Sequence, residues 1–420
     1  MSDYSAGFKS SVLENGITLY VNHIPDKTFE VFSFLVHSGA EKDQIGLEGT
    51  AHFVEHVISR NSSTSRKEKE LFFSDCGGGA DFGSTGYLFT RYRFFLPINK
   101  SSIIKGLSIF ADMLLSADIK EIDIQRKVIV EEFNRKYKVS FEFNLDLKRN
   151  KILYPGIWLG RFASPFGDLD SIPKIQKDDL QNFYNEHYNP KNISIFCAGG
   201  MTIKEVEEVI KETSFSKNKD GEKGVIDNPE LVFKALSENR YIFNFSEYYS
   251  KNDVIKAARY YMYVKIPNSF SSNPIVFTIL KRIFNEVLYD KIREERGWTY
   301  SINAQFENYK HFITFYISCN NLNISALDEI EDAIDECINM IKSDSELFNR
   351  IKKQTIAKSF INDDTVFDIV GNAMDFIIFA GRIISNEDKR KLIESVTMEN
   401  IIDLLEYFKS EYRWTLIMKP

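Results

Sequence analysis

The sequence predicts an α+β protein built from two related domains. At 420 residues the chain is longer than one hydrophobic core usually supports, because such cores stop growing at about 250–300 residues. Strand-like and helix-like segments follow one another in the same order in both halves. Between the halves, residues 216–229 are polar, lack hydrophobic periodicity and are typical of a linker. We therefore expect a domain over 1–215, a linker over 216–232 and a second domain over 233–420.

The N-terminal half begins with strand patterns and continues with helices. Asn15-Gly16 is a turn signal before the first apolar segment, and residues 31–36 form a mostly apolar run of strand length. A helix is expected after the glycine-containing loop that ends near Thr50, with Thr50 or a neighbour as its cap. The other patterns are strands at 17–21 and 92–96, the latter in a pair that flanks residues 77–79, and helices at 103–115 and about 122–137.

The C-terminal half has the same order of strands and helices. Residues 260–264 have the composition of a strand and precede a helical pattern at about 274–293. Residues 312–317 are likewise strand-like and precede a helical pattern at 326–341. This rhythm favours two related domains, although no residue-level repeat proves a duplication.

Composition and charge bear on the class of function. The formal net charge is −7 and no dense Lys/Arg tract stands out, so we expect no nucleic-acid partner. The four cysteines are widely spaced without a C-x-x-C pair, so neither a disulfide framework nor a zinc knuckle is indicated. We find neither a signal-peptide pattern nor an uncharged apolar stretch of about 18 residues, and therefore expect no membrane span and a cytoplasmic location.

The segment His52-Phe53-Val54-Glu55-His56 is the strongest indication of chemistry. In a helix, both imidazoles and the carboxylate would project from one face, because positions i, i+3 and i+4 lie over one another. Two histidines at this spacing can share a zinc ion, and the carboxylate is placed to take a proton from a water there. The order H-x-x-E-H is the inverse of H-E-x-x-H. Taken by itself, the pentapeptide is equally compatible with surface or core histidines.

A catalytic zinc site needs a third protein ligand and one open position. Glu131 and Glu132 lie in the helical pattern at 122–137, and either carboxylate is a candidate. The same acid pair could instead belong to the exposed face of an amphipathic helix. The residues alone leave both interpretations open.

Several motifs together resemble those of the pitrilysin/insulinase-type zinc metallopeptidases, family M16. Residues 49–56, GTAHFVEH, closely resemble the signature G-x-A-H-F-x-E-H. Glu132 stands at the family's spacing for the third ligand, within a segment similar to V-V-x-E-E-I. Further similar segments are LENGI at 13–17, VHSGAE at 36–41 and HYNPKN at 187–192.

The resemblance implies a fold and a zinc site. Each of the two domains is expected to be a mostly antiparallel sheet with helices packed on one face. One Zn²⁺ per chain would be bound by His52, His56 and Glu132, with Glu55 as the general base. The implied activity is that of a zinc endopeptidase acting on peptides or unstructured polypeptide segments.

The resemblance also implies residues that contact the substrate. Residues 292–301, IREERGWTYS, look like the element L-R-E-x-R-G-x-x-Y-S, in which Arg293 and Tyr300 would contact substrate carbonyl groups. The edge strand that pairs with the substrate backbone, N-A-x-T in the family, appears here as Phe82-Gly83-Ser84-Thr85. Its asparagine is replaced by Phe82, so substrate preference is expected to differ.

Two other departures concern Gln125, where the family often has a second glutamate, and residues 282–287, which replace a run rich in glycine and serine. Because family members of this length supply half of a closed chamber, we expect a homodimer or a heterodimer with a related, zinc-less subunit. The alternatives are a subunit dedicated to processing one precursor or leader peptide, and a non-catalytic structural subunit.

Overall fold

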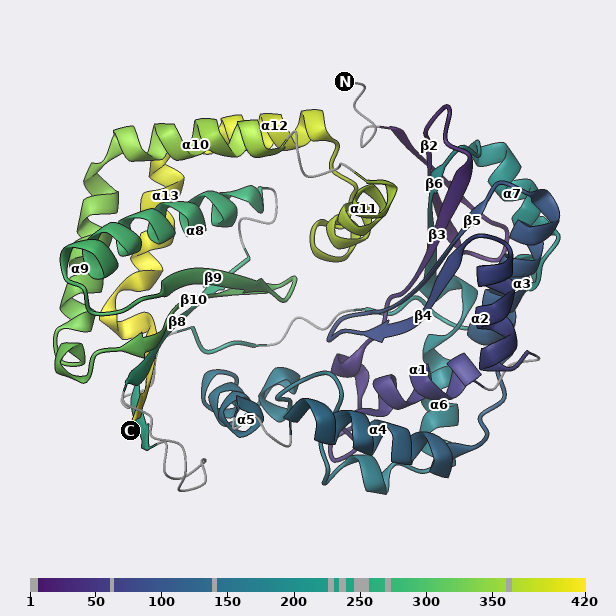
Figure 1. Cartoon of the computed structure of the whole chain (residues 1–420), viewed down its shortest axis with the longest axis horizontal. Coiled ribbons are helices and arrows are strands. Elements are labelled where there is room, and N and C mark those ends of the chain that lie inside the picture. The colour runs from purple at the N-terminus through teal and green to yellow at the C-terminus, as the bar shows by residue number, and fades with distance from the viewer. Residues whose placement is uncertain are drawn as a thin grey trace. The chain divides into compact units, whose positions relative to one another are not determined.

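The structure is a computed structural model that describes residues 7–60, 64–137, 142–225, 230–233, 239–244, 257–268, 273–359 and 365–420. The chain divides into two units, each with its own sheet and helices (Figure 1). The first unit combines Met1–Asp227 with Asp363–Ser385, and the second combines Asn228–Asn362 with Asn386–Pro420. The prediction of two α+β domains is confirmed.

The sheet of the first unit has six strands in the order β1-β2-β6-β3-β5-β4. All neighbouring pairs are antiparallel except β2 with β6. β4 is an edge strand, which pairs only with β5 among the described residues. The strands are β1 (Phe8–Val12), β2 (Thr18–His23), β3 (Phe29–Val36), β4 (Gly79–Thr85), β5 (Thr90–Pro97) and β6 (Ile193–Gly199).

Both faces of this sheet are buried. Along β3, Phe32 and Phe34 face a core shared with helices such as α1 and α3, whereas Val31 and Leu35 face a second core shared with α11. Side chains alternate between the faces of a strand, so an apolar run such as β3 suits a sheet covered on both sides. The helices of this unit are α1 (Thr50–Arg60), α2 (Arg66–Asp75), α3 (Lys100–Leu115), α4 (Ile122–Tyr137), α5 (Glu142–Leu153), α6 (Lys177–His187), α7 (Ile203–Lys211) and α11 (Val366–Ala380).

The position of α11 differs from the predicted domain boundaries. The sequence placed everything after residue 233 in the C-terminal domain, and helices on one face of each sheet. The structure instead assigns 363–385 to the first unit, where α11 covers the second face of the sheet (Figure 1). Val366, Val370 and Met374 become buried there, and this apolar contact is the physical reason for the assignment.

The predicted linker is held along the first unit for part of its length. The Lys219 ammonium donates to the carbonyl of Tyr188 at 2.7 Å, and the Gly224 N–H donates to Asn192 Oδ1 at 2.6 Å. Residues 226–229 of the predicted linker lie outside the described part of the chain.

The sheet of the second unit has five strands in the order β7-β11-β8-β10-β9. It too contains one parallel pair, β7 with β11, among antiparallel neighbours. Alternate residues of β8 and β10 enter one core together with α8 and α9. The strands are β7 (Arg240–Asn244), β8 (Ala258–Pro267), β9 (Ile302–Asn308), β10 (Phe312–Leu322) and β11 (Arg413–Lys419); the helices are α8 (Ile275–Leu288), α9 (Ile330–Ser343), α10 (Ser345–Ser359), α12 (Asn386–Ser395) and α13 (Met398–Leu405).

Two expected helices of this unit have different bounds in the structure. The helix expected at 274–293 is α8 followed by a π-helix, Tyr289–Glu295. The helix expected at 326–341 begins at Ile330, after a short 3-10 turn. No helix in the described part of the chain is both long and apolar enough to cross a membrane.

Candidate metal centre

Helix α1 carries three of the predicted site residues, and Asp43 fixes its start. The two Asp43 carboxylate oxygens accept hydrogen bonds from the N–H groups of Gly49 (2.7 Å) and Ala51 (2.8 Å). They thereby satisfy N–H groups at the helix start that have no partner within the helix. Thr50, the expected cap, is the first helical residue, and its hydroxyl donates to Leu47 instead. The expectation was that Thr50 or a neighbour caps the helix; Thr50 does not, and the side-chain acceptor is Asp43.

His52, His56 and Glu132 meet as predicted, two from α1 and one from α4. The two Nε2 atoms lie 3.2 Å apart, and Glu132 Oε2 lies 3.2 Å from His56 Nε2 and 3.9 Å from His52 Nε2. Donors about 2.0–2.1 Å from a tetrahedral zinc ion are about 3.3–3.4 Å from one another. The spacing and the donor types therefore fit zinc. In the described part of the chain, this is the group of three metal-ligating side chains that could hold an ion.

The protonation states also suit a metal site. Burial lowers the pKa of His52 to about 3, so its ring is neutral, as a metal ligand must be. The hydrogen bond from His56 lowers the pKa of Glu132 and keeps it a carboxylate. His52 Nδ1 is buried without a hydrogen-bond partner among the described residues. The orientation of this ring therefore depends on packing, for example against Phe166 at 4.4 Å between ring centroids.

Glu55 is buried next to this group and is held by the edge strand β4. The Thr85 hydroxyl donates to Glu55 Oε2 at 3.1 Å. Burial raises the pKa of Glu55 to about 7, which suits a group that accepts and releases a proton near neutral pH. Gly83 lies so close that a Cβ atom there would be 2.3 Å from Glu55 Oε1. Only glycine leaves room for the carboxylate at this position.

The predicted substrate strand is present as β4, at the sheet edge, with a register shift between Asp81 and Ser84. Its side chains also have roles within the chain itself. Phe82 is largely buried and stacks on Phe110 at 5.5 Å, and it also lines the pocket beside Glu55. Gly83 and Thr85 shape the position of Glu55. Substrate pairing along the backbone of β4 stays a prediction.

Arg293 and Tyr300 lie together in the second unit. The Arg293 guanidinium carbon lies 4.6 Å from the centre of the Tyr300 ring and 4.7 Å from that of Tyr289. Such cation–π contacts hold the guanidinium in place. Tyr300 is 75% exposed, so its hydroxyl is open to a ligand. Arg293 belongs to the π-helix, a distortion that occurs often at functional sites.

The two departures from the family pattern have local explanations. Gln125 is buried on α4, and its Oε1 has no hydrogen-bond partner among the described residues; an unpaired glutamate would cost still more to bury there. Within 282–287, Asn285 accepts from the Ala304 N–H at 2.7 Å and donates to the Ala304 carbonyl at 3.0 Å. It thereby fixes α8 against β9, and Arg282 and Glu286 reach α10.

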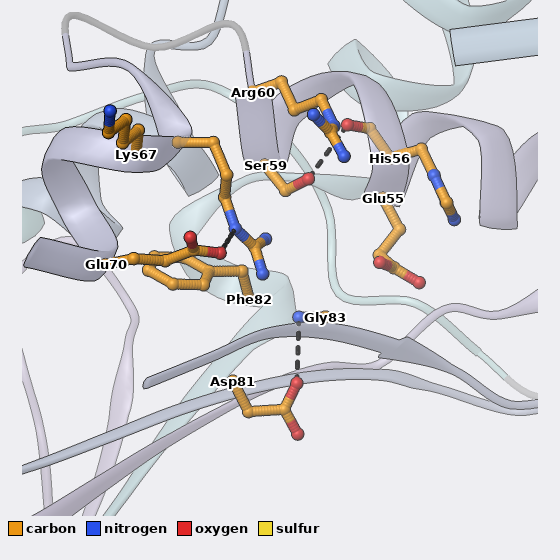
Figure 2. A pocket seen from close by; sticks show the side chains of 10 residues that line it. Glu55, His56, Ser59, Arg60, Lys67, Glu70, Asp81, Phe82 and Gly83 are labelled. Carbon is orange, nitrogen blue, oxygen red and sulfur yellow. Dashed lines mark hydrogen bonds and ion pairs between the residues drawn. The ribbon is translucent and has the colours of Figure 1, made fainter. Parts of the chain in front are cut away.

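A pocket of about 440 Å³ adjoins Glu55 and His56, and the sequence prediction missed it. Its walls are the end of α1, the start of α2 and the middle of β4 (Figure 2). Three basic residues line the pocket: Arg60, Arg66 and Lys67. Their grouping shortly after the H-x-x-E-H segment is the sequence signal that could have indicated it.

Comparisons with known proteins find the same family in both halves of the chain. Residues 19–146 match the family model described as insulinase (peptidase family M16), and residues 174–355 match that of the peptidase M16 inactive domain. The zinc protease PqqE of Helicobacter pylori is 21% identical, over 99% of this chain and 94% of its own. The mitochondrial-processing peptidase subunit beta of Saccharomyces cerevisiae is 25% identical over 48% of this chain and 43% of its own. The crystal structure of a protease from Helicobacter pylori superposes with a TM-score of 0.81 at 19% identity, covering 98% of this chain and 99% of that one.

Proposed function

The chain belongs to the M16 family of peptidases, and we propose that it is a zinc-dependent endopeptidase for peptides or unstructured polypeptide segments. The observation that supports this most is the joint placement of three metal donors and a buried carboxylate. His52, His56 and Glu132 have the spacing of zinc ligands. Glu55 lies on α1, the helix that carries both histidines. A structural subunit would have no need of a buried carboxylate that leaves the neighbouring strand room only for glycine.

Zinc, when bound, would make a water molecule more acidic and polarise the scissile carbonyl. His52, His56 and Glu132 would hold one ion per chain. Glu55 would take the proton from the attacking water and deliver it to the leaving amine. The Thr85 hydroxyl orients Glu55 for both transfers through its hydrogen bond.

The substrate and the partner belong to the same proposal. The substrate backbone would add as a strand to the edge of β4, the mode in which an exposed sheet edge binds a peptide. Arg293 and Tyr300 would donate hydrogen bonds to the peptide carbonyl or to the oxyanion that forms there. The assembly we propose is a homodimer, or a heterodimer with a related subunit, and the mass of the protein in solution tests it.

Substitutions at the carboxylates test the activity. Glu55→Gln should retain zinc and lose peptide hydrolysis by roughly 10²–10⁴-fold, because it removes the proton acceptor and none of the ligands. Glu132→Gln should weaken zinc binding, whereas the exposed neighbour Glu131→Gln, a matched control, should retain both zinc and activity. Zinc content by mass spectrometry and cleavage of a peptide library are the measurements. Wild-type cleavage rates for Glu55→Gln would show that the assigned base is wrong.

Processing of one dedicated precursor is the second candidate. The similarity to processing-peptidase beta subunits over the N-terminal half favours it. The same peptide library separates the two: a general endopeptidase cleaves many unrelated sequences, and a dedicated one cleaves few.

A further inference from the structure

The pocket beside Glu55 carries an inference about the substrate. We propose that it binds an acidic side chain, Asp or Glu, of the residue that directly follows the scissile bond. This rests on the proposed peptidase function. Three observations support it: the position of the pocket beside Glu55, the fixed guanidinium of Arg66, and the balance of charges in the pocket.

The pocket begins at the reaction centre. Glu55 and His56 line it together with Ser59 and Arg60 of the same helix (Figure 2). Opposite them, Figure 2 shows Asp81 and Gly83 on β4, and Lys67 and Glu70 on α2. A side chain in this space would therefore lie next to the proton-transferring carboxylate.

The chemistry of Glu55 decides which substrate residue is meant. A general base that later acts as an acid must reach the leaving nitrogen within hydrogen-bond distance. This nitrogen belongs to the residue after the scissile bond. The side chain of that residue is attached one carbon away, so it is the one that a pocket bordered by Glu55 receives.

Arg66 presents a fixed fork of donors. Its Nε donates to Glu70 Oε1 at 2.7 Å, and its guanidinium carbon lies 4.0 Å from the centre of the Phe82 ring. These two contacts fix the orientation of the guanidinium plane. Within the described parts of the chain, the two terminal nitrogens of Arg66 have no acceptor. Paired guanidinium nitrogens match a carboxylate in a bidentate hydrogen bond.

The remaining charges of the pocket favour an anion. Arg60 and Lys67 have no acidic partner among the residues that the structure describes. The three acids of the pocket are already engaged. Glu55 accepts from the Thr85 hydroxyl at 3.1 Å, Glu70 pairs with Arg66, and Asp81 contacts the Gly83 N–H at 3.4 Å and Arg93 at 4.0 Å. An acidic substrate side chain would therefore meet unpaired cations, whereas a basic one would be repelled.

One buried contact ties two walls of the pocket together, and a capping box fixes the start of one of them. The buried Lys69 ammonium donates to the carbonyl of Ser59 at 3.0 Å and so ties α2 to the end of α1. Ser65 and Glu68 form a capping box at the start of α2. The positions of Arg60 and Arg66 are thus fixed relative to each other before a substrate binds.

The test uses two peptides that differ only by Glu or Gln after the scissile bond. Both are amidated at the C-terminus, so that a terminal carboxylate cannot supply the negative charge. A third peptide ends at the Gln residue with a free carboxylate, and its cleavage measures what a terminal carboxylate contributes. We expect zinc-loaded wild-type protein to cleave the Glu peptide with a kcat/KM about 10-fold or more above that of the Gln peptide. A preference confined to the free C-terminus would overturn the assignment to a side chain.

Variants assign the preference to the pocket. Arg66→Gln should bring the ratio for the two peptides close to one, because the Glu peptide then loses the guanidinium that pairs with its carboxylate. Arg60→Gln should lower the ratio in the same direction, which keeps the test open if Arg66→Gln fails to fold. Arg390→Gln, an exposed arginine of α12 in the second unit, is the matched control and should keep the wild-type ratio. An unchanged ratio in both pocket variants would overturn the proposal.

Binding separates this proposal from the proposed activity. The same peptides are titrated onto Glu55→Gln, and the Glu peptide should bind about 10-fold more tightly. Cleavage of both peptides without a preference would overturn the pocket assignment and leave the peptidase standing. A preference in binding without any cleavage by wild-type protein would support the pocket and contradict the peptidase.

Discussion

Glu55 shows how a single residue depends on its neighbours in space. Its carboxylate is buried, accepts one hydrogen bond from Thr85 and lies directly against the backbone of Gly83. The sequence assigned Gly83 and Thr85 to substrate contact, because the strand resembles a substrate-binding motif. The structure shows that both contact Glu55 and position its carboxylate.

Gly83→Ala should impair the base and spare the metal. A Cβ atom would lie 2.3 Å from Glu55 Oε1, and a φ of 154° is unfavourable for alanine, so the carboxylate must move. We expect kcat to fall by about 10-fold or more with zinc content unchanged, measured on the same samples. Gly86→Ala is the control, because its nearest contact is the ring of Phe89 at 3.2 Å. A Gly83→Ala variant with full activity would refute this role.

Glu30 is a buried carboxyl group outside the metal centre. It lies on β3, and its Oε2 accepts from the Met201 N–H at 2.9 Å, while Oε1 has no partner among the described residues. Burial raises its pKa from 4.5 to about 8. Between these values the folded protein keeps a proton that the unfolded chain has released, so stability falls as the pH rises through this window and the loss is complete above about pH 8.

Glu30→Gln should therefore remove a pH-dependent loss of stability. Its amide keeps an oxygen for Met201 and cannot ionise. We expect melting temperatures within about a degree of wild type at pH 5 and several degrees higher at pH 9, measured by calorimetry. The exposed Glu131→Gln should show the same difference from wild type at both pH values. Equal shifts for Glu30→Gln at both pH values would contradict this explanation.

At the scale of elements, local patterns predicted what local interactions decide. The helices expected at 103–115 and 122–137 are α3 and α4, with bounds close to those of the patterns. The start of α1 was expected near Thr50, with Thr50 or a neighbour as its cap, but the side-chain acceptor is Asp43, which is not adjacent to the helix in sequence. β6 was not singled out, although it is buried throughout and lies between β2 and β3.

Helix α11 should control the stability of the unit that holds the metal centre. Ile369 is buried in the core that α11 shares with β3 and β6. Ile369→Ala should destabilise the first unit by roughly 2–4 kcal/mol and lower the temperature of zinc release, because it leaves a cavity. Ile338→Ala, in the second unit on α9, should lower the stability of that unit and leave zinc release unchanged. If Ile338→Ala lowered the temperature of zinc release and Ile369→Ala did not, the assignment of α11 to the first unit would be contradicted.

At the scale of the whole molecule, two units of similar construction carry different groups of the predicted site residues. Each has a mostly antiparallel sheet with one parallel pair. The first unit holds the metal donors, Glu55 and the basic pocket, and the second holds the pair of Arg293 and Tyr300. The continuous chain was expected to divide once, but it returns to the first unit through α11.

The sequence by itself predicted the α+β class, the helix of His52, Glu55 and His56, and the carboxylate, Glu132, that lies beside the two histidines. These follow from spacing along one helix and from the resemblance to a family. Only the tertiary structure decided that Asp43 caps α1, that Gly83 makes room for Glu55, that α11 covers the first sheet and that Arg60 and Arg66 line a pocket. Each of these joins residues from different elements, and such contacts depend on how the chain packs, which no local periodicity encodes.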